Sequence, residues 1–412
     1  MSKASEESIR CSFCGREKKE VNVLIAGITG HICDSCISQA HLIVKEEGGL
    51  KSKKEIEETL KLLTPKEIVD KLNKHVIGQD EAKKVLSVAV YNHYKRLLQK
   101  NNVNDNIEIE KSNVIMVGET GTGKTLLART IANLLNVPFC IADATVLTEA
   151  GYVGEDVESI LSRLLQAADY NVQSAERGIV FIDEIDKVAR KSDNPSITRD
   201  VSGEGVQQAM LKLLEGAQVS VPPQGGRKHP EQKMIQIDTK NILFICGGAF
   251  DGISKIIERR VKSQSIGFNS LSGEEFNDEK MLSHVNQLDI KKYGLIPELI
   301  GRFPVLTYLH PLTKETLISI LTDPQNALIK QYVKLFEMDD VKLIIKDEVL
   351  NYIVEKAILL KLGARGLRSI CEAILTESMF NAPEKDIKEL IIDVSYAEKQ
   401  FLKSKISKLK VA

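Results

Sequence analysis

The sequence predicts an α/β fold with a parallel sheet, preceded by a small cysteine-rich module and followed by a smaller, mostly helical domain. Three observations support this prediction. Three short apolar runs, "NVIMVG", "GIVFID" and "NILFICGG", alternate with amphipathic helices through the middle of the chain, which is typical of a parallel sheet covered on both faces. Four cysteines crowd the first 36 residues. After about residue 313 the strand pattern fades and helical periodicity dominates, with short strand patterns remaining in "VKLII" and "LIIDVS".

The composition is that of a soluble globular protein. Hydrophobic residues make up 43% of the 412 residues and charged residues 27%, which is enough for sizeable cores. The formal net charge is −1 and tryptophan is absent, which argues against nucleic acid or a membrane surface as a partner. No apolar stretch approaches the length of a bilayer span, and the first residues lack the apolar core of a signal peptide. We therefore expect a cytoplasmic protein that binds neither nucleic acid nor membrane.

The cysteine spacing predicts a structural zinc site. The pattern is C-x2-C-x18-C-x2-C, in which each CxxC turn supplies two thiolates to a tetrahedral ion. A redox CxxC or four unrelated buried thiols are the alternatives, and the second CxxC at this distance disfavours both. The stretch "EVNVLIAGITGHI" between the pairs predicts two short strands. The expected zinc ligands are Cys11, Cys14, Cys33 and Cys36.

Domain boundaries follow from helix caps and composition. "TPKE" at 64–67 has the form of a capping box with Thr64 as the N-cap, which indicates the start of a new domain. The stretch before it is charged and contains a Gly-Gly break, as a linker would. We therefore expect a zinc-binding module (1–48), a linker (49–63), a large α/β domain (64–312) and a small helical domain (313–412).

A phosphate-binding loop follows the first strand of the large domain. "GETGTGKT" at 118–125 fits G-x-x-x-x-G-K-[ST] and lies between the apolar run "NVIMVG" and a helix. In this context backbone N–H groups wrap the phosphates, Lys124 reaches the β- and γ-phosphates and Thr125 helps to hold magnesium. A glycine-rich turn without a ligand is the alternative. The expected ATP-binding residues here are Gly118, Glu119, Thr120, Gly121, Thr122, Gly123, Lys124, Thr125 and Leu126.

Two carboxylates end the next apolar run, "GIVFID". The carboxyl ends of parallel strands face the ligand crevice, so we expect Asp183 to hold magnesium and Glu184 to orient and deprotonate the attacking water. A solvated strand end is the alternative, and it would be preferred without the phosphate loop upstream. Together with that loop, the acidic pair predicts ATP hydrolysis.

Several further motifs carry a resemblance to a known family. They are "VIGQD", "GYVGED", "FIDEIDK", "RKHP", "QSIGF", "LIPELIGRFP" and "GARGLRS". With the cysteines and the phosphate loop, this set resembles the AAA+ P-loop ATPases, and within them the unfoldase subunits of the Clp proteases. The resemblance covers Cys11 to at least Arg368.

The resemblance implies an ATP-dependent protein unfoldase with ATP, Mg²⁺ and Zn²⁺ as its cofactors. It would form a homo-hexamer, recognise tagged proteins with or without adaptor proteins, and thread them through its pore into the ClpP peptidase. Because the chain has no G-x-S-x-G and no H-E-x-x-H, we expect no peptidase activity of its own. The alternative function is a nucleic-acid-remodelling ring ATPase with a zinc knuckle, which the balanced charge disfavours.

The resemblance also implies roles for single residues. Val76 and Ile77 would contact adenine. Arg302 would be an arginine finger on a neighbouring subunit's γ-phosphate, and Arg365 would couple nucleotide to movement of the small domain. Without the resemblance, each arginine would be read as a surface side chain. Glu119 stands where family members usually carry proline, and we expect its carboxylate to point away from the phosphates.

Three loops complete the expected machinery. In "EAGYVGED" a bulky pair on a hinge-like loop would grip polypeptide in the pore, although a tyrosine packed on a neighbouring helix is the alternative. "RKH" in a polar segment resembles the basic loop at the pore entrance, and "IGF" the loop that docks onto the peptidase; a solvated turn and a loop tucked onto its own domain are their alternatives. The residues are Gly151, Tyr152, Val153, Gly154; Arg227, Lys228, His229; Ile266, Gly267 and Phe268.

Overall fold

The computed structural model describes most of the chain. The described residues are 10–40, 62–99, 107, 109–148, 154–189, 203–222, 234–264, 281–383 and 388–406. The chain divides into two compact units, Met1–Lys61 and Leu62–Ala412, and each is described by itself. Most of the expected linker, residues 49–61, lies outside the described ranges.

The first unit is organised around its cysteines. A short 3-10 helix, η1 (Lys18–Glu20), precedes the antiparallel strands β1 (Leu24–Ala26) and β2 (His31–Cys33), and residues 34–40 are helical. The two strands predicted between the cysteine pairs are confirmed. The buried apolar residues of the described part are Cys11, Cys33 and Cys36. Because this unit has so little hydrocarbon core, its folding depends on a link between its cysteine sulfur atoms.

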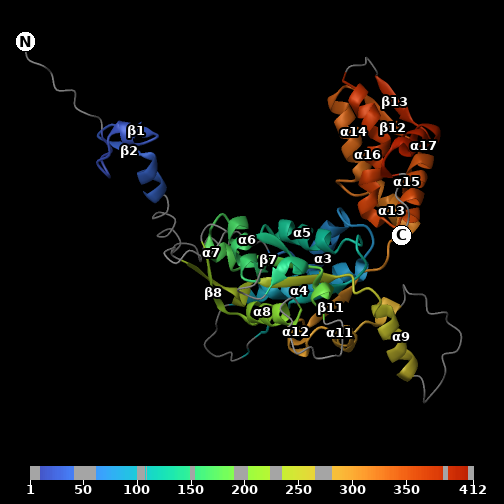
Figure 1. The fold of residues 1–412 in the computed structure, drawn as a ribbon, viewed down its shortest axis with the longest axis horizontal. Helices are drawn as coiled ribbons and strands as arrows, with labels where there is room; N and C mark the ends of the chain where they lie inside the picture. Colours follow the sequence, from blue (N-terminus) through green and yellow to red (C-terminus); the bar gives the residue numbers. More distant parts are fainter. Residues whose placement is uncertain are drawn as a thin grey trace, which may run out of the picture. The chain divides into compact units, whose positions relative to one another are not determined.

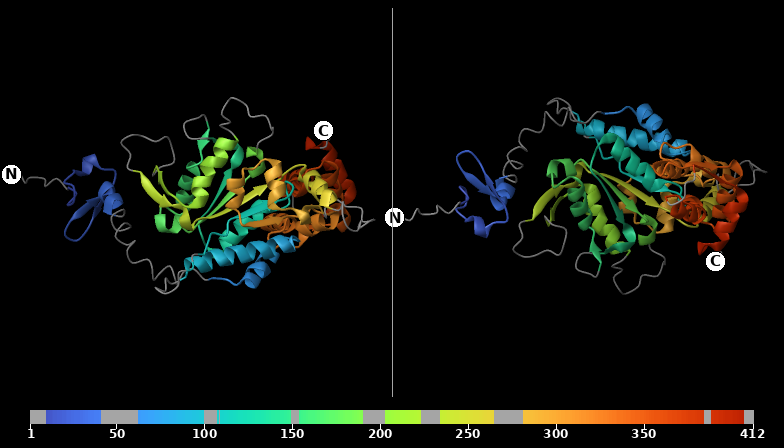
Figure 2. Two further views of the ribbon diagram at one scale, coloured as in Figure 1. Left: turned by 90° about the horizontal axis from the view of Figure 1, so that it is seen from below. Right: turned by 90° about the horizontal axis from the view of Figure 1, so that it is seen from above.

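The second unit contains a five-stranded parallel sheet with the order β11-β3-β10-β7-β4. Its strands are β3 (Val114–Val117), β4 (Phe139–Asp143), β7 (Ile179–Asp183), β10 (Leu243–Gly248) and β11 (Val305–Tyr308). The three predicted apolar strands are confirmed as β3, β7 and β10, the central strands of the sheet. They are almost entirely buried because helices cover both faces (Figure 2).

The helices of the large α/β part follow the alternation that the sequence predicts. They are α3 (Pro65–Asn73), α4 (Asp80–Leu97), α5 (Lys124–Leu135), α6 (Ser159–Ala167), α7 (Val172–Ala175), α8 (Glu204–Glu215), α9 (Ile253–Gln264), α11 (Gln287–Tyr293) and α12 (Pro297–Gly301). The capping box at the start of α3 is confirmed, since Thr64 and Glu67 each accept a hydrogen bond from the other's backbone N–H.

Short pairs of strands extend from the sheet region. β5 (Leu147–Thr148) pairs in parallel with β6 (Glu155–Asp156), and β8 (Gln218–Val221) pairs antiparallel with β9 (Ile235–Asp238). One-turn 3-10 helices, among them η4 (Ile185–Val188) and η5 (Thr239–Asn241), connect the longer elements.

The C-terminal part has a hydrophobic core of its own. It comprises α13 (Lys314–Thr322), α14 (Leu328–Met338), α15 (Asp347–Leu359), α16 (Gly363–Asn381) and α17 (Val394–Lys403). Figure 1 shows these helices gathered around the parallel pair β12 (Lys342–Ile345) and β13 (Glu389–Ile392), the two short strands predicted there. Within the described ranges, no helix is both long and apolar enough to cross a membrane.

Candidate active site and metal centre

The phosphate loop connects β3 to α5 through backbone conformations that favour glycine. Gly121 and Gly123 have φ values of +89° and +103°, which residues with a Cβ rarely adopt. Gly118 has no space for a side chain, because an added Cβ would lie 2.9 Å from the Cβ of Leu309. Helix α5 then begins at Lys124, and the backbone N–H groups of its first turn have no hydrogen-bond acceptor within the helix. Such a helix start binds anions such as phosphate.

Lys124 is anchored inside this loop. Its side chain is buried, and Nζ donates to the carbonyl oxygens of Gly118 at 2.5 Å and Glu119 at 2.9 Å. Burial lowers the pKa of Lys124, while the nearby carboxylates of Asp183 and Asp186 raise it. The ammonium group is therefore positioned beside the loop where a phosphate would offer oxygen acceptors in place of the carbonyls.

The end of β7 presents the predicted acidic pair to the same place. Thr125 Oγ1 donates to Asp183 Oδ2 at 3.1 Å. Glu184 turns the chain sharply after the strand, with φ of +57°, and its N–H donates to Asp183 Oδ1 at 3.0 Å. A hydroxyl beside a carboxylate is the hard oxygen donor set that Mg²⁺ prefers, so the residues present fit a magnesium ion held together with nucleotide phosphates.

A cavity of about 280 Å³ joins these groups. Its lining residues are Thr120, Gly121, Gly123, Lys124, Thr125, Leu126, Asp183, Glu184, Asp186, Lys187, Ala249, Ala364 and Arg365. The structure thus brings four predicted catalytic residues to one cavity: the loop lysine, the two strand-end acids, and Arg365 near the start of α16.

The sequence reasoning missed part of this lining. Asp186 is buried, its Oδ1 accepts from the N–H of Ala249 at 3.0 Å, and Lys187 Nζ lies 3.2 Å from its Oδ2. These contacts join the carboxyl ends of β7 and β10. Two signals could have identified these residues, because Asp186 follows Asp183 by three positions in the same motif and Ala249 directly follows the third predicted strand.

Other predicted residues lie away from the cavity. Among the described residues that line it, Val76, Ile77 and Glu119 do not appear, and Glu119 is exposed. Arg302 directly follows α12, where its side chain is half exposed and pairs with Glu215 at 2.6 Å. An arginine that serves a neighbouring subunit would not line the cavity of its own chain.

The predicted loops fall mostly outside the described residues, namely Gly151, Tyr152, Val153, Arg227, Lys228, His229, Ile266, Gly267 and Phe268. Gly154 is described and has φ of +150°. An added Cβ there would lie 2.3 Å from Thr148 Cγ2, so only glycine fits. The parallel pairing of Leu147 with Glu155 holds the two ends of this loop together.

The four predicted zinc ligands converge in the first unit. Their sulfur atoms all lie within 4.8 Å of one another, and the Cys14 and Cys33 sulfurs are 3.6 Å apart. Tetrahedral coordination at about 2.3 Å places sulfurs about 3.8 Å apart, so the geometry fits zinc. Burial disfavours the Cys11 thiolate, yet backbone N–H groups, Cys14 N–H foremost, lower the pKa of Cys11 to about 6. Burial and the neighbouring thiols raise the pKa of Cys36 to about 12. Without a cation, Cys36 therefore stays protonated beside the Cys11 thiolate, whereas a bound cation would favour the thiolate form of both.

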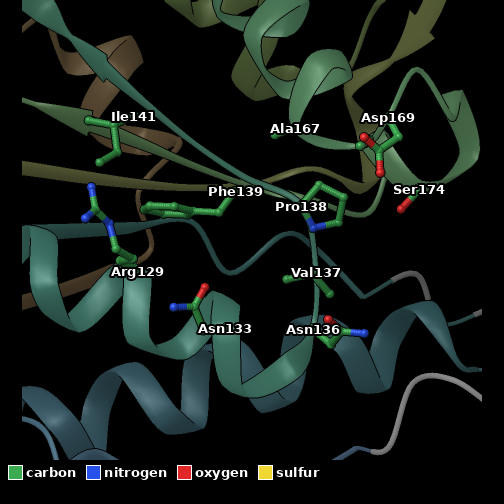
Figure 3. Close-up of a pocket in the computed structure, with 11 residues that line it drawn as sticks. Arg129, Asn133, Asn136, Val137, Pro138, Phe139, Ile141, Ala167, Asp169 and Ser174 are labelled. Atoms are coloured by element: carbon green, nitrogen blue, oxygen red, sulfur yellow. The ribbon is translucent and has the colours of Figure 1, made fainter. Parts of the chain in front are cut away.

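A larger cavity of about 660 Å³ lies beside the edge strand β4. Figure 3 shows Arg129 and Asn133 of α5 on one side of it and Asp169 and Ser174 on the other. None of its lining residues belongs to the phosphate loop or to the acidic strand end. We assign the nucleotide to the smaller cavity, because the charged groups suited to phosphoryl chemistry converge there.

Comparisons with protein families agree with this site. Residues 109–306 match the AAA domain (Cdc48 subfamily), and residues 9–46 match the ClpX C4-type zinc finger. Residues 312–390 match the C-terminal D2-small domain of ClpB protein.

Similar proteins extend the match to the whole chain. A Bacteroides fragilis protein described as "ATP-dependent Clp protease ATP-binding subunit ClpX" is 60% identical over 416 residues, covering 100% of both chains. Proteins with the same description from Bacteroides thetaiotaomicron, 60% identical over 99% of each chain, and Porphyromonas gingivalis, 59% identical over 97% of each chain, are also similar. The full-length identity and the zinc-finger match together show that this chain belongs to the ClpX family of AAA+ ATPases.

Proposed function

We propose that this chain is a subunit of the protein-unfolding ring of a cytoplasmic Clp protease. As a ClpX-family AAA+ ATPase it uses ATP with Mg²⁺, and it carries structural Zn²⁺. Six copies form a ring that recognises tagged proteins, unfolds them and passes them through its pore to the ClpP peptidase. The observation that carries the proposal is the convergence of Lys124, Asp183, Glu184 and Arg365 on one cavity.

Each of the cavity residues has a separate role in ATP hydrolysis. Lys124 binds the β- and γ-phosphates, and Thr125 and Asp183 hold magnesium, which neutralises charge on the phosphates when bound. Glu184 accepts a proton from the attacking water. Since Arg365 lies on α16, whose apolar face belongs to the C-terminal core, binding and loss of nucleotide would shift that part of the chain.

A ring supplies what a single chain lacks at this cavity. Among the described residues, the positively charged side chains that line the cavity are Lys124, Lys187 and Arg365, and Lys187 is already paired with Asp186 and Asp251. Arg302 is half exposed outside its own cavity, where it could reach the γ-phosphate held by the next subunit. A fixed positive charge supplied in this way stabilises the charge that spreads over the transferred phosphoryl group.

The loop closed by the β5–β6 pair would transmit the movement to substrate. Tyr152 and Val153 would press on polypeptide in the pore by bulk and apolar contact, with little need for sequence recognition. Because a folded domain is stable by about 5–15 kcal/mol, one such contact would often slip and repeated strokes would be needed.

Degradation of a tagged, folded reporter with ClpP and ATP tests the function. We expect ATP-dependent loss of the reporter with the parent protein. Tyr152→Ala should retain ring assembly and ATPase activity. It should degrade the folded reporter poorly but still degrade an unstructured one. Tyr170→Ala is the matched control, because Tyr170 is a partly exposed tyrosine of the large α/β part.

Two results would contradict the proposal. The first is a reporter that stays folded in the presence of ATP and parent protein. The second is an ATPase rate that rises with DNA and not with unfolded protein, which would favour a nucleic-acid motor. A joint fall in thermal stability and ATPase rate for Tyr152→Ala would instead mean that this tyrosine packs within its own domain.

A further inference from the structure

Arg302 is held at two points by residues from distant parts of the chain. Its carbonyl oxygen accepts a hydrogen bond from Asn113 Nδ2 at 3.1 Å. Its Nη2 pairs with Glu215 Oε1 at 2.6 Å. Asn113 directly precedes β3, and Glu215 is the last residue of α8. Backbone and guanidinium are therefore each positioned by a separate side chain.

Asn113 is a buried residue whose side-chain nitrogen, side-chain oxygen and backbone carbonyl oxygen each have a hydrogen-bond partner. It is 1% exposed. Besides the bond to Arg302, its Oδ1 accepts from the N–H of Phe244 at 3.2 Å, and its carbonyl oxygen accepts from the N–H of Val305 at 3.3 Å. Asn113 thereby connects the starts of β10 and β11 with the end of α12. A buried polar side chain satisfied in this way has one orientation.

The Glu215 side of the pair is anchored by the same segment. Lys111 Nζ donates to the carbonyl oxygens of Leu214 at 3.2 Å and Thr239 at 2.7 Å. Residues 111–113 thus contact both the end of α8 and the end of α12. The segment continues directly into β3, which ends at the phosphate loop. A continuous run of bonded residues therefore joins the phosphate loop of a subunit to its own Arg302.

The ion pair leaves part of the guanidinium available. Arg302 donates to Glu215 through Nη2, and to the described residues its Nε and Nη1 donate no hydrogen bond. The two side chains are 50% and 43% exposed. An exposed pair of this kind contributes little to stability, so an ordinary surface contact is the alternative explanation for Glu215.

We propose that Asn113 and Glu215 are positioning residues for Arg302, which set the direction of its guanidinium toward the neighbouring subunit. Asn113 fixes the backbone from which the side chain extends, and Glu215 orients the charged end while leaving N–H donors for phosphate. This inference rests on the proposed function, in which Arg302 acts in trans.

Mixed rings separate a role in trans from a structural one. One subunit type carries Arg302→Ala and keeps a working site, and the other carries Glu184→Gln and donates the finger without hydrolysing. Each type alone should be inactive, and mixing should restore ATPase activity. Adding Glu215→Gln to the finger-donating type should lower the restored rate about two- to fivefold. The same substitution in the Arg302→Ala type should change nothing, because that subunit has no finger to position.

Asn113→Asp provides the second variant. It keeps the size of the side chain and the acceptor for Phe244 N–H, but it replaces the donor to Arg302 with an oxygen. In the finger-donating type it should lower the restored rate about tenfold, with unchanged KM for ATP. Thermal unfolding and nucleotide binding of this variant show whether it folds. Glu355→Gln, which breaks the exposed Lys314–Glu355 pair of the C-terminal part, is the matched control and should leave the rate unchanged.

The outcomes are distinguishable. If the parent mixture regains no activity, Arg302 does not act in trans, and the proposed function of this residue and our inference fail together. If the parent mixture regains activity but folded Glu215→Gln and Asn113→Asp subunits donate the finger as well as the parent does, the proposed function stands and the inference is wrong. Equal losses of the restored rate, whether the substitution is placed in the finger-donating type or in the Arg302→Ala type, would show a structural role. That result would also overturn the inference.

Discussion

Thr125 donates a hydrogen bond to Asp183 at 3.1 Å, although 58 positions separate the two residues. Thr125 follows β3, and Asp183 is the last residue of β7. The two strands are not neighbours, because β10 lies between them in the sheet. Parallel strands place all their carboxyl ends at one edge of the sheet, where ligands bind. The hydroxyl and the carboxylate that would share magnesium are therefore brought together by strand order.

Two substitutions at the nucleotide site should separate binding from turnover. Lys124→Ala removes a phosphate contact that exists in the ground state, so it should weaken ATP binding. Glu184→Gln leaves that contact intact and removes the proposed base, so binding should persist while the rate falls by about 100-fold or more. Fluorescent-nucleotide binding and phosphate release measure the two effects. A near-parental rate for Glu184→Gln would mean that another group takes the proton.

Metal removal should affect the first unit alone. We expect about one zinc per chain, bound by Cys11, Cys14, Cys33 and Cys36. Chelation should unfold this unit, because its buried core consists of the ligands themselves, while the ATPase rate survives. Elemental analysis and limited proteolysis measure both effects. Cys140→Ala, in β4, is the control and should leave the zinc content unchanged; reduced parent protein without zinc would contradict the assignment.

His93 should make the second unit sensitive to acid. Burial lowers its pKa from 6.5 to about 3, with the charges of Arg96 and Lys111 adding to the effect, and its Nε2 lies 3.1 Å from the carbonyl oxygen of Asn241. Between these two pKa values the unfolded chain binds a proton that the folded chain does not. The free energy of unfolding should therefore fall as the pH drops from 6.5 toward 3, by at most about 1.4 kcal/mol per pH unit from this group.

Denaturant unfolding at several pH values tests this sensitivity. His93→Gln keeps a donor for the carbonyl of Asn241 but cannot titrate, so its stability should vary less with pH across this range. His284→Gln, at an exposed position, should follow the parent curve. Parallel curves for His93→Gln and the parent would show that His93 is not the responsible group.

The proposed peptidase-docking loop should be separable from the ATPase. Phe268→Ala should leave ATPase activity and unfolding close to parental levels while it impairs ClpP-dependent degradation, because an apolar anchor of a docking loop contributes to binding and not to hydrolysis. Asn269→Ala in the same loop is the control. An equal loss of ATPase activity would favour the alternative that Phe268 packs within its own domain.

Features that depend on local pattern can be predicted from the amino-acid sequence. The central strands β3, β7 and β10 are continuous apolar runs, which only a strand covered on both faces can bury. The Thr64 cap and the phosphate loop depend on bonds within a few residues. The zinc ligands form two close pairs, and so their spacing alone revealed them.

Contacts that depend on strand order and helix placement could not be predicted in this way and became visible in the folded chain. The edge strand β4 alternates buried and partly exposed residues, and the edge strand β11 has two partly exposed residues followed by two buried ones. Over so short a length, both patterns give a weak local signal. Asp186 and Arg365 meet at the cavity, and Glu215 meets Arg302, through residues far apart in the chain. No periodicity encodes such meetings, because they are fixed by how the strands of one sheet are ordered and which helix ends reach its edges.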